Sequence, residues 1–207
     1  MAMAQERPGI EVQRGRVVQA LRTLVADRGV ENITAEALAR AAGVSRATFY
    51  RCFSSLDEVV EVLYDDFERH VDGRLERFLP AGSLSGDWLD GLIDQVLDDA
   101  MEMGPLLHAL YREELRPGSR AADRQRRRVA RQIESIARWW ESATRIPASL
   151  PLVEAIILLL QASGLRLAGT QDEKDRQNHH QAVRFMIEAT IARFAAEAGA
   201  EAPTPPG

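Results

Sequence analysis

Residues 34–53 read TAEALARAAGVSRATFYRCF, and this stretch decides the fold. Thr34 offers a hydroxyl that can cap a helix start, and the alanine-rich residues 35–40 after it are strong helix formers. Gly43 tolerates the positive φ that a tight turn between helices needs, and Ser45 is the next N-cap. The stretch therefore predicts two short helices joined by a glycine turn, which is a helix-turn-helix.

The second helix of this unit has two chemically different faces. Phe49 and Phe53 are four residues apart and predict an inward, apolar face. No acidic residue stands between Ser45 and Leu56, so the polar face suits a surface that meets DNA phosphates. A solvated structural helix would normally mix the two signs of charge. The side chains that we predict on the outward face are Arg46, Thr48, Tyr50 and Arg51.

Apolar residues at helical spacing flank the unit on both sides. Before it, Gly29 stands where a glycine C-cap would end a first helix. After it, a pattern from Val59 to Phe78 at steps of three or four predicts a long fourth helix that leads away from the unit. The apolar positions of the first helix are Val17, Val18, Leu21, Leu24 and Val25.

The run of residues 29–60, GVENITAEALARAAGVSRATFYRCFSSLDEVV, resembles the DNA-binding head of the TetR (tetracycline repressor-like) family of bacterial regulators. The resemblance implies a three-helix head and a larger helical body that binds a small-molecule effector and forms a homodimer. Two residues depart from the family's pattern: Cys52 stands where an aromatic or other large residue is common, and Leu56 stands where the family usually has a lysine that reaches a phosphate. The side chains that the resemblance places at operator DNA are Thr34, Ser45, Arg46, Thr48, Tyr50 and Arg51.

Charge is divided unevenly along the 207 residues, whose formal net charge is −5. Residues 1–55 carry eight arginines against five acidic residues, which leaves 18 basic and 26 acidic residues for the remainder. An acidic body repels the duplex and presents only the head to it. We therefore predict a helix-turn-helix DNA-binding domain over residues 1–55, a helical ligand-binding and dimerisation domain over 56–198, and a disordered tail over 199–207.

The remaining composition favours a cytoplasmic, all-α protein. The single cysteine excludes an intramolecular disulfide, and the N-terminal MAMAQERPG lacks the apolar core of a secretion signal. The longest apolar run, Ala155–Leu160, is far short of a membrane span. No strand pattern appears, so we predict an all-α protein, and the breaks between helical stretches indicate about nine helices. Proline and glycine breaks divide the body at residues 80–83, 104–105, 117–118, 147–151 and 169–172.

The last two helices are the candidates for a homodimer interface. The segment Leu152–Ala168 is apolar and holds small residues that allow another helix to approach closely. The final helix has an apolar surface wider than a single core contact needs. The alternative is that both helices form intramolecular core. The interface residues that we select are Ala162, Gly164, Ala168, Val183, Ile187 and Ile191.

A small-molecule pocket in the body is the second expectation, although methionine and aromatic side chains form core more often than pocket. His108 and Arg112 share a helix face and could together hold an anionic group. They could equally form a solvated pair beside Glu113, which we favour slightly. The candidate lining residues are Met101, His108, Tyr111, Arg112 and Trp139.

Other classes of function have weaker support. The chain lacks the Glu-x-x-His pairs of di-iron bundles and the glycine-rich phosphate loops, so we expect no enzyme and no cofactor. The neighbours His179 and His180 diverge on a helix, which argues against a metal site, and the arginine-rich run 124–131 is interpreted as a solvated face. We expect a ligand-responsive repressor that binds a palindromic double-stranded DNA operator as a homodimer. The alternative is a helical interaction module that has lost DNA binding.

Overall fold

The computed structural model describes residues 9–79, 88–170 and 172–197. Within these ranges the chain forms nine α-helices and one 3₁₀ turn, with no strand, as the sequence predicts. The predicted break at 80–83 and the predicted tail at 199–207 lie outside the described residues. The elements are α1 Ile10–Arg28, η1 Val30–Asn32, α2 Ala35–Ala41, α3 Arg46–Cys52, α4 Leu56–Phe78, α5 Trp88–Met103, α6 Pro105–Glu114, α7 Arg120–Thr144, α8 Leu150–Leu167 and α9 Glu173–Glu197.

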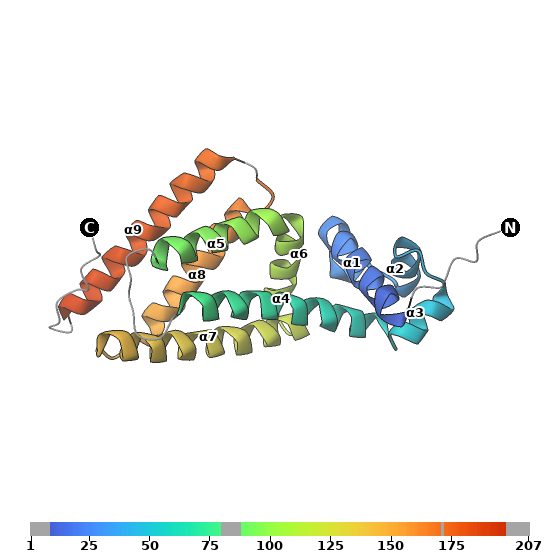
Figure 1. Cartoon of the computed structure of the whole chain (residues 1–207), viewed down its shortest axis with the longest axis horizontal. Helices are drawn as coiled ribbons and strands as arrows, with labels where there is room; N and C mark the ends of the chain where they lie inside the picture. The colour runs from blue at the N-terminus through green and yellow to red at the C-terminus, as the bar shows by residue number, and fades with distance from the viewer. Residues whose placement is uncertain (1–8, 80–87, 171, 198–207) are drawn as a thin grey trace.

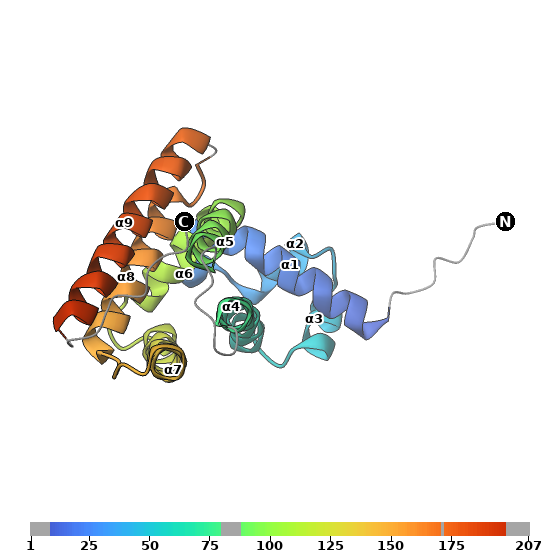
Figure 2. The same ribbon diagram turned by 60° about the vertical axis from the view of Figure 1, so that its left-hand side comes forward.

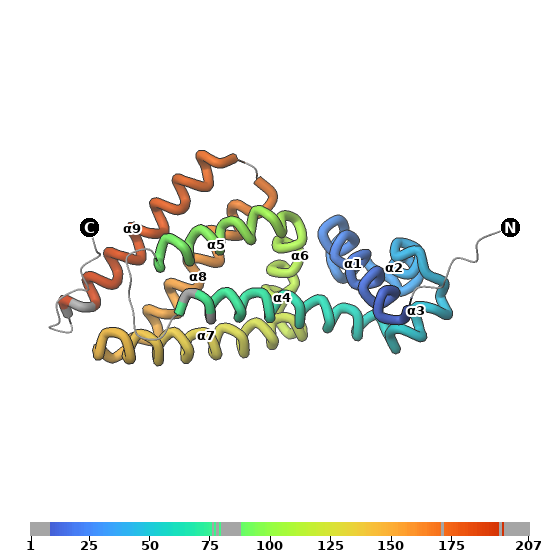
Figure 3. The backbone as a smooth tube through the Cα atoms, viewed as in Figure 1, coloured from blue at the N-terminus to red at the C-terminus, as the bar shows by residue number. Residues whose placement is uncertain are grey.

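The helices form a small head and a larger body. Helices α1, α2 and α3 gather at one end of the molecule, and α5, α8 and α9 lie at the other end (Figure 1). Helix α4 starts beside α3 and runs from the head into the body next to α7, which the tube view shows over its full length (Figure 3). Helix α4 is continuous over 23 residues and so connects the head to the body without a break.

Local capping chemistry produces the head helices. The Thr34 hydroxyl oxygen accepts a hydrogen bond from the Ala37 amide at 3.1 Å, so α2 begins directly after Thr34. Gly43 has a φ of +65° in the turn that follows, a value that a side chain with a Cβ resists. The Ser45 hydroxyl then accepts from the Thr48 amide at 3.1 Å and starts α3. The predicted helix-turn-helix is confirmed in both its caps and its turn.

One apolar core joins the head to the body. Phe49 and Phe53, predicted to face inward, are almost completely buried together with Leu21 from α1. The same cluster continues without interruption into α6, where Leu106 and Leu110 are buried against it. The head is therefore packed on α6 through α1, in addition to its covalent link through α4.

The body is built around α5, which packs against α8 and α9. Gly164 on α8 allows this close packing, because a Cβ built there would lie 3.3 Å from the Cβ of Ala100. Charge pairs add to the contact between α5 and α9, where Arg176 donates to Asp98 at 2.6 Å and to Asp94 at 2.9 Å. Viewed from the side, α8 and α9 form the outer layer of the body (Figure 2).

The interpretation of the arginine-rich run as a solvated face is wrong for Arg124 and Arg128, whereas Arg126, Arg127 and Arg131 are exposed. Arg128 is 1% exposed and pairs with the equally buried Glu114 through two hydrogen bonds of 2.9 and 3.1 Å. Arg124 forms an ion-pair ladder with Glu61 and Glu68 of α4. The acids that pair with Arg124 and Arg128 lie more than ten residues away in sequence, so the charge pattern along the chain did not reveal these pairs.

Helix α8 as a whole is long and apolar enough to cross a membrane by length and composition, with a mean hydropathy of 1.6 over Leu150–Leu167. Only 28% of that helix is buried within this chain. The uninterrupted apolar run in the sequence, Ala155–Leu160, covers only part of this helix. An apolar face on α8 is therefore left uncovered by the rest of the described chain.

Candidate functional site

Helix α3 exposes the predicted DNA-binding face. Arg46, Tyr50 and Arg51 are exposed to solvent, whereas Phe49, between them, is buried. The Arg46 guanidinium lies 5.7 Å from the centre of the Tyr50 ring, so these two side chains form one patch one turn apart. A cationic and hydroxyl-bearing patch on a short exposed helix has the chemistry that binds phosphates and base edges.

The other predicted side chains at this face have structural partners. Thr34 and Ser45 are exposed, but their hydroxyls already cap α2 and α3. Thr48 is half-buried, and its hydroxyl accepts from Ser45 at 2.9 Å. Arg51 donates to Gln13 of α1 at 2.8 Å, which ties the end of α3 to the first helix. These contacts hold α3 in place and leave Arg46 and Tyr50 as the side chains freest to meet DNA.

The two departures from the family pattern are absorbed by the core. Cys52 is buried in the head, and Leu56, the first residue of α4, packs partly against the same cluster. Leu56 therefore provides no charged group where α4 begins. Leu56 stands three residues before Val59, so it continues the apolar spacing of α4 by one step toward the start of the helix.

The joint between α3 and α4 is fixed by a reciprocal cap. The Ser55 hydroxyl accepts from the Glu58 amide at 3.2 Å, and the Glu58 carboxylate accepts from the Ser54 amide at 2.6 Å. The hydrogen bonds from the Ser54 backbone and hydroxyl lower the pKa of Glu58 below its ordinary value. The first turn of α4 thus holds an ionised carboxylate that fixes the position of α3 relative to α4.

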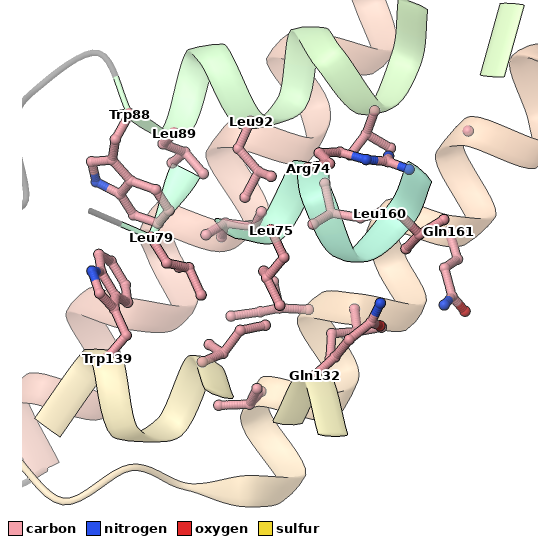
Figure 4. A pocket seen from close by; sticks show the side chains of 18 of the residues that line it. Arg74, Leu75, Leu79, Trp88, Leu89, Leu92, Gln132, Trp139, Leu160 and Gln161 are labelled. Carbon is pink, nitrogen blue, oxygen red and sulfur yellow. The ribbon is translucent and has the colours of Figure 1, made fainter. Parts of the chain in front are cut away.

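A cavity of about 160 Å³ lies inside the body, lined by residues from α4 to α9. Its wall is predominantly apolar. In the close-up view, Trp88 and Trp139 lie on one side, Gln132 and Gln161 lie on the other, and leucines fill the wall between them (Figure 4). The two indole rings are 5.1 Å apart between centroids, so they contact each other. The labelled leucines are Leu75, Leu79, Leu89, Leu92 and Leu160.

A charged pair lies in the polar part of this wall. Arg74 Nε lies 3.5 Å from the Asp99 carboxylate, which also lies 2.9 Å from His70 Nε2 and accepts from Gln95 at 2.7 Å. Burial lowers the pKa of Arg74, and the neighbouring Asp99 opposes that change. Burial likewise raises the pKa of the Tyr111 phenol to about 12. At neutral pH the wall therefore presents a neutral phenol and an internally paired charge.

Only two of the predicted ligand-binding residues line the cavity. Tyr111 and Trp139 do, and Tyr111 also stacks edge-on against Phe67 of α4 at 6.2 Å. Met101 instead packs into the cluster between α5, α8 and α9. His108 is exposed, as the solvated alternative predicts, and lies 3.3 Å from the Ala168 carbonyl. Arg112 is exposed too, and its guanidinium approaches Gly29 of the head.

The polar lining residues were not predictable from the sequence, because they come from helices with no obvious ligand-binding pattern. Arg74 belongs to a helix that was assigned only a connecting role, and Asp99 is one acid among many on α5. Gln132 lies within the arginine-rich helix α7. Helical periodicity could have placed Arg74 on the same face as Phe67 and Val71, but not beside α5.

Most residues selected for the dimer interface face their own subunit. Val183 and Ile187 are 2% and 1% exposed, and Gly164 packs against α5. Ala168 and Ile191 are partly buried, Ile191 in the cavity wall, which leaves Ala162 exposed. The small residue Gly164 therefore allows an intrasubunit contact with α5. The larger exposed apolar side chains on the outer face of α8 and α9 are Leu150, Leu158, Phe185 and Met186.

Comparison with known proteins agrees with this geometry. Residues 17–63 match the sequence model of the bacterial regulatory proteins of the tetR family. A search of curated proteins found no match. A tetR-family transcriptional regulator from Streptomyces coelicolor is 23% identical, with a TM-score of 0.67 over 93% of this chain and 87% of that one.

Two further solved structures share the fold. A transcriptional regulator from Rhodococcus sp. Rha1 has a TM-score of 0.70 at 17% identity, over 87% of this chain and 96% of its own. Salmonella enterica GusR has a TM-score of 0.69 at 15% identity, over 86% and 94%. The matched segment contains the capped helix-turn-helix, and the fold extends over the body. Residues 17–63 therefore match the DNA-binding segment of the tetR family of bacterial regulatory proteins, and the chain shares its overall fold with these transcriptional regulators.

Proposed function

We propose that the protein is a ligand-responsive repressor that binds a palindromic operator as a homodimer in the cytoplasm. The observation that carries this proposal is the single buried core that joins the head to α6, because α6 also carries Tyr111 into the cavity wall. A molecule in the cavity and a duplex at α3 would then act on one packed unit. The two binding events are coupled if each favours a different position of that unit.

The DNA contacts would come from the exposed patch of α3. We assign Arg46 to a base edge or phosphate and Tyr50 to a phosphate, with Thr34, Ser45, Thr48 and Arg51 supporting the surface. In a two-fold dimer the two α3 helices would enter successive major grooves, roughly 34 Å apart. The operator is therefore proposed to be a palindrome whose half-sites are about one helical turn apart.

The subunit contact would use the outer faces of α8 and α9. Leu158, Phe185 and Met186 are 50%, 72% and 51% exposed, and further exposed alanines lie on the same two helices. Such a face is larger than the scattered apolar residues of an ordinary surface, and a second copy would cover it by an isologous four-helix contact. The alanines on this face are Ala155, Ala162, Ala182 and Ala189.

Effector binding would act through α4 and α6. The rings of Phe67 and Tyr111 make an edge-to-face contact in the cavity wall, and both residues belong to helices that contact the head. A ligand that displaces either ring would move α4 or α6 against α1. The spacing of the two α3 helices in the dimer would change, and the affinity for the operator would fall.

The DNA assignment is tested by selecting a random duplex library with the purified protein and sequencing the bound fraction. We expect one palindrome to be enriched, and Arg46→Ala to weaken binding to it by roughly 10-fold or more. Arg138→Ala, an exposed arginine on α7, is the control and should bind normally. Absence of any enriched sequence would favour the helical interaction module without DNA binding.

The dimer assignment is tested by sedimentation at micromolar concentration. Phe185→Glu introduces a charge into the proposed contact and should yield monomers, with a loss of operator affinity because the two half-site contacts are no longer linked. Leu115→Glu changes an equally exposed apolar residue between α6 and α7 and should remain dimeric. A wild-type monomer, or a dimer that survives Phe185→Glu, contradicts the proposed interface.

A further inference from the structure

The size of the body cavity restricts what it can hold. At about 160 Å³ it is close to the volume of an apolar protein cavity, about 150 Å³, that accommodates one benzene molecule. Pockets for drug-sized ligands are larger, on the order of 300–1,000 Å³. The closed contact between Trp88 and Trp139 limits extension at that side. One ring with a short substituent therefore fits this cavity, whereas a polycyclic drug or a long acyl chain does not.

The charges in the wall argue against an ionic ligand. Among the described residues that line the cavity, Arg74 and Asp99 are the charged ones, and they lie 3.5 Å apart as a pair. The pair is neutral as a unit, and Asp99 is also held by Gln95 and His70, so a carboxylate or an ammonium ligand would bring an uncompensated charge into an apolar cavity. Removing a charge from water without a partner is costly. A neutral ligand avoids this cost.

The uncharged polar groups in the wall include donors that need an acceptor. The Trp140 indole Nε1 is buried and finds no hydrogen-bond acceptor among the described residues, although an indole can only donate. The Tyr111 hydroxyl is a second donor in the same wall. Buried donors in native structures are nearly always paired, so an unpaired one at a cavity wall indicates where a ligand oxygen belongs.

We infer that the cavity binds a small neutral molecule with one ring and one oxygen acceptor, of the size and chemistry of a phenol or a benzyl alcohol. The ring would lie among the leucines, and the oxygen would accept from the Trp140 indole or the Tyr111 hydroxyl. Calling this molecule the effector rests on the proposed function, but its binding to the cavity does not.

The charge requirement is tested with three ligands of similar shape: benzyl alcohol, benzoate and benzylammonium. Each is titrated into the full-length protein at pH 7 without DNA, by calorimetry and by intrinsic fluorescence, because all three tryptophans line the cavity. We expect benzyl alcohol to bind with a Kd on the order of 0.1–1 mM, as its few atoms allow, and the two ions at least about 10-fold more weakly. Equal or tighter binding of either ion would overturn the inference.

Two variants locate the site and the hydrogen bond. Leu92→Phe fills part of the cavity and should abolish binding of benzyl alcohol, with circular dichroism confirming the fold. Trp140→Phe removes the unpaired N–H, so the preference for benzyl alcohol over toluene should fall by roughly 2- to 10-fold, the range of one net hydrogen bond. A preference that is unchanged in Trp140→Phe and also in Tyr111→Phe refutes the assigned donors.

The outcome separates this inference from the proposed function. Binding of benzyl alcohol with no effect on operator affinity would support the ligand class and contradict only the ligand-responsive repressor. Conversely, 1-pyrenemethanol has the same hydroxymethyl group on four fused rings and should not bind saturably. If it binds more tightly than benzyl alcohol, the inferred size limit is wrong, whatever the protein does on DNA.

Discussion

The buried pair Arg128–Glu114 offers the sharpest test of how this fold is held together. The Arg128 side chain reaches from α7 to Glu114 of α6, and its guanidinium lies 5.0 Å from the centre of the Phe67 ring. Neither charged side chain of the pair reaches solvent. Burial raises the pKa of Glu114, and the hydrogen bonds from Arg128 oppose that rise. We predict that Arg128→Met destabilises the protein because it leaves this carboxylate without its partner.

The magnitude follows from the choice that Glu114 then faces. It can stay ionised in an apolar site, or it can take up a proton. Keeping a carboxyl whose ordinary pKa is 4.5 protonated at pH 7 costs about 3.4 kcal/mol, at 1.36 kcal/mol per pKa unit. The free energy of unfolding should therefore fall by about 3 kcal/mol, which agrees with the roughly 3–5 kcal/mol seen when one partner of a buried pair is removed. That is a large part of the total stability of a typical domain.

The assay is urea unfolding followed by circular dichroism between pH 5 and pH 7.5. In Arg128→Met the folded state holds a proton on Glu114 that the unfolded state releases above pH 4.5. Stability relative to wild type should therefore fall by about 1.4 kcal/mol for each unit of rising pH. Adding Glu114→Leu should restore most of the loss, and Arg127→Met, on the exposed side of α7, is the control. A loss below about 1 kcal/mol at pH 7, or one that does not change with pH, would refute this reasoning.

Three further predictions concern single residues. Ser45→Ala removes the oxygen that accepts from the Thr48 amide at 3.1 Å, and it should cost about 1 kcal/mol in urea unfolding, with no loss expected if α3 needs no cap. Gly164→Leu places side-chain atoms where a Cβ alone already lies 3.3 Å from Ala100, so we expect a loss of roughly 1–3 kcal/mol in the monomeric Phe185→Glu background as well; a loss seen only in the dimer would return Gly164 to the interface. Because burial raises the pKa of Tyr111 to about 12, stability should be fully present below pH 10 and fall as pH rises toward 12, and Tyr111→Phe should flatten part of that fall in alkaline unfolding curves.

The helix-turn-helix of the head was predictable, because the interactions that determine it are local. An N-cap contacts an amide three residues ahead, a glycine turn depends on its own φ, and the inward and outward faces of a short helix follow from a period of 3.6 residues. Thr34, Gly43 and Ser45 therefore appear in the structure in the roles that the sequence assigns them. The same argument applies to the burial of Phe49 and Phe53.

The body was not predictable at the level of residues, because its contacts join segments far apart in the chain. The periodicity of α9 shows that Val183 and Phe185 lie on different faces, but not which face α5 covers. Arg128 looked solvated until Glu114, 14 residues earlier, was placed beside it.

The sequence by itself determined the helical class of the protein, the location of α3 and the polar side chains that α3 exposes. What only the tertiary structure decided is the membership of the cavity wall, the partner of each buried charge and the face of α8 and α9 that remains uncovered. The physical reason is range. Caps, turns and amphipathic faces depend on neighbours within about one helical turn, whereas a cavity or a buried ion pair exists only where several helices are packed at specific positions.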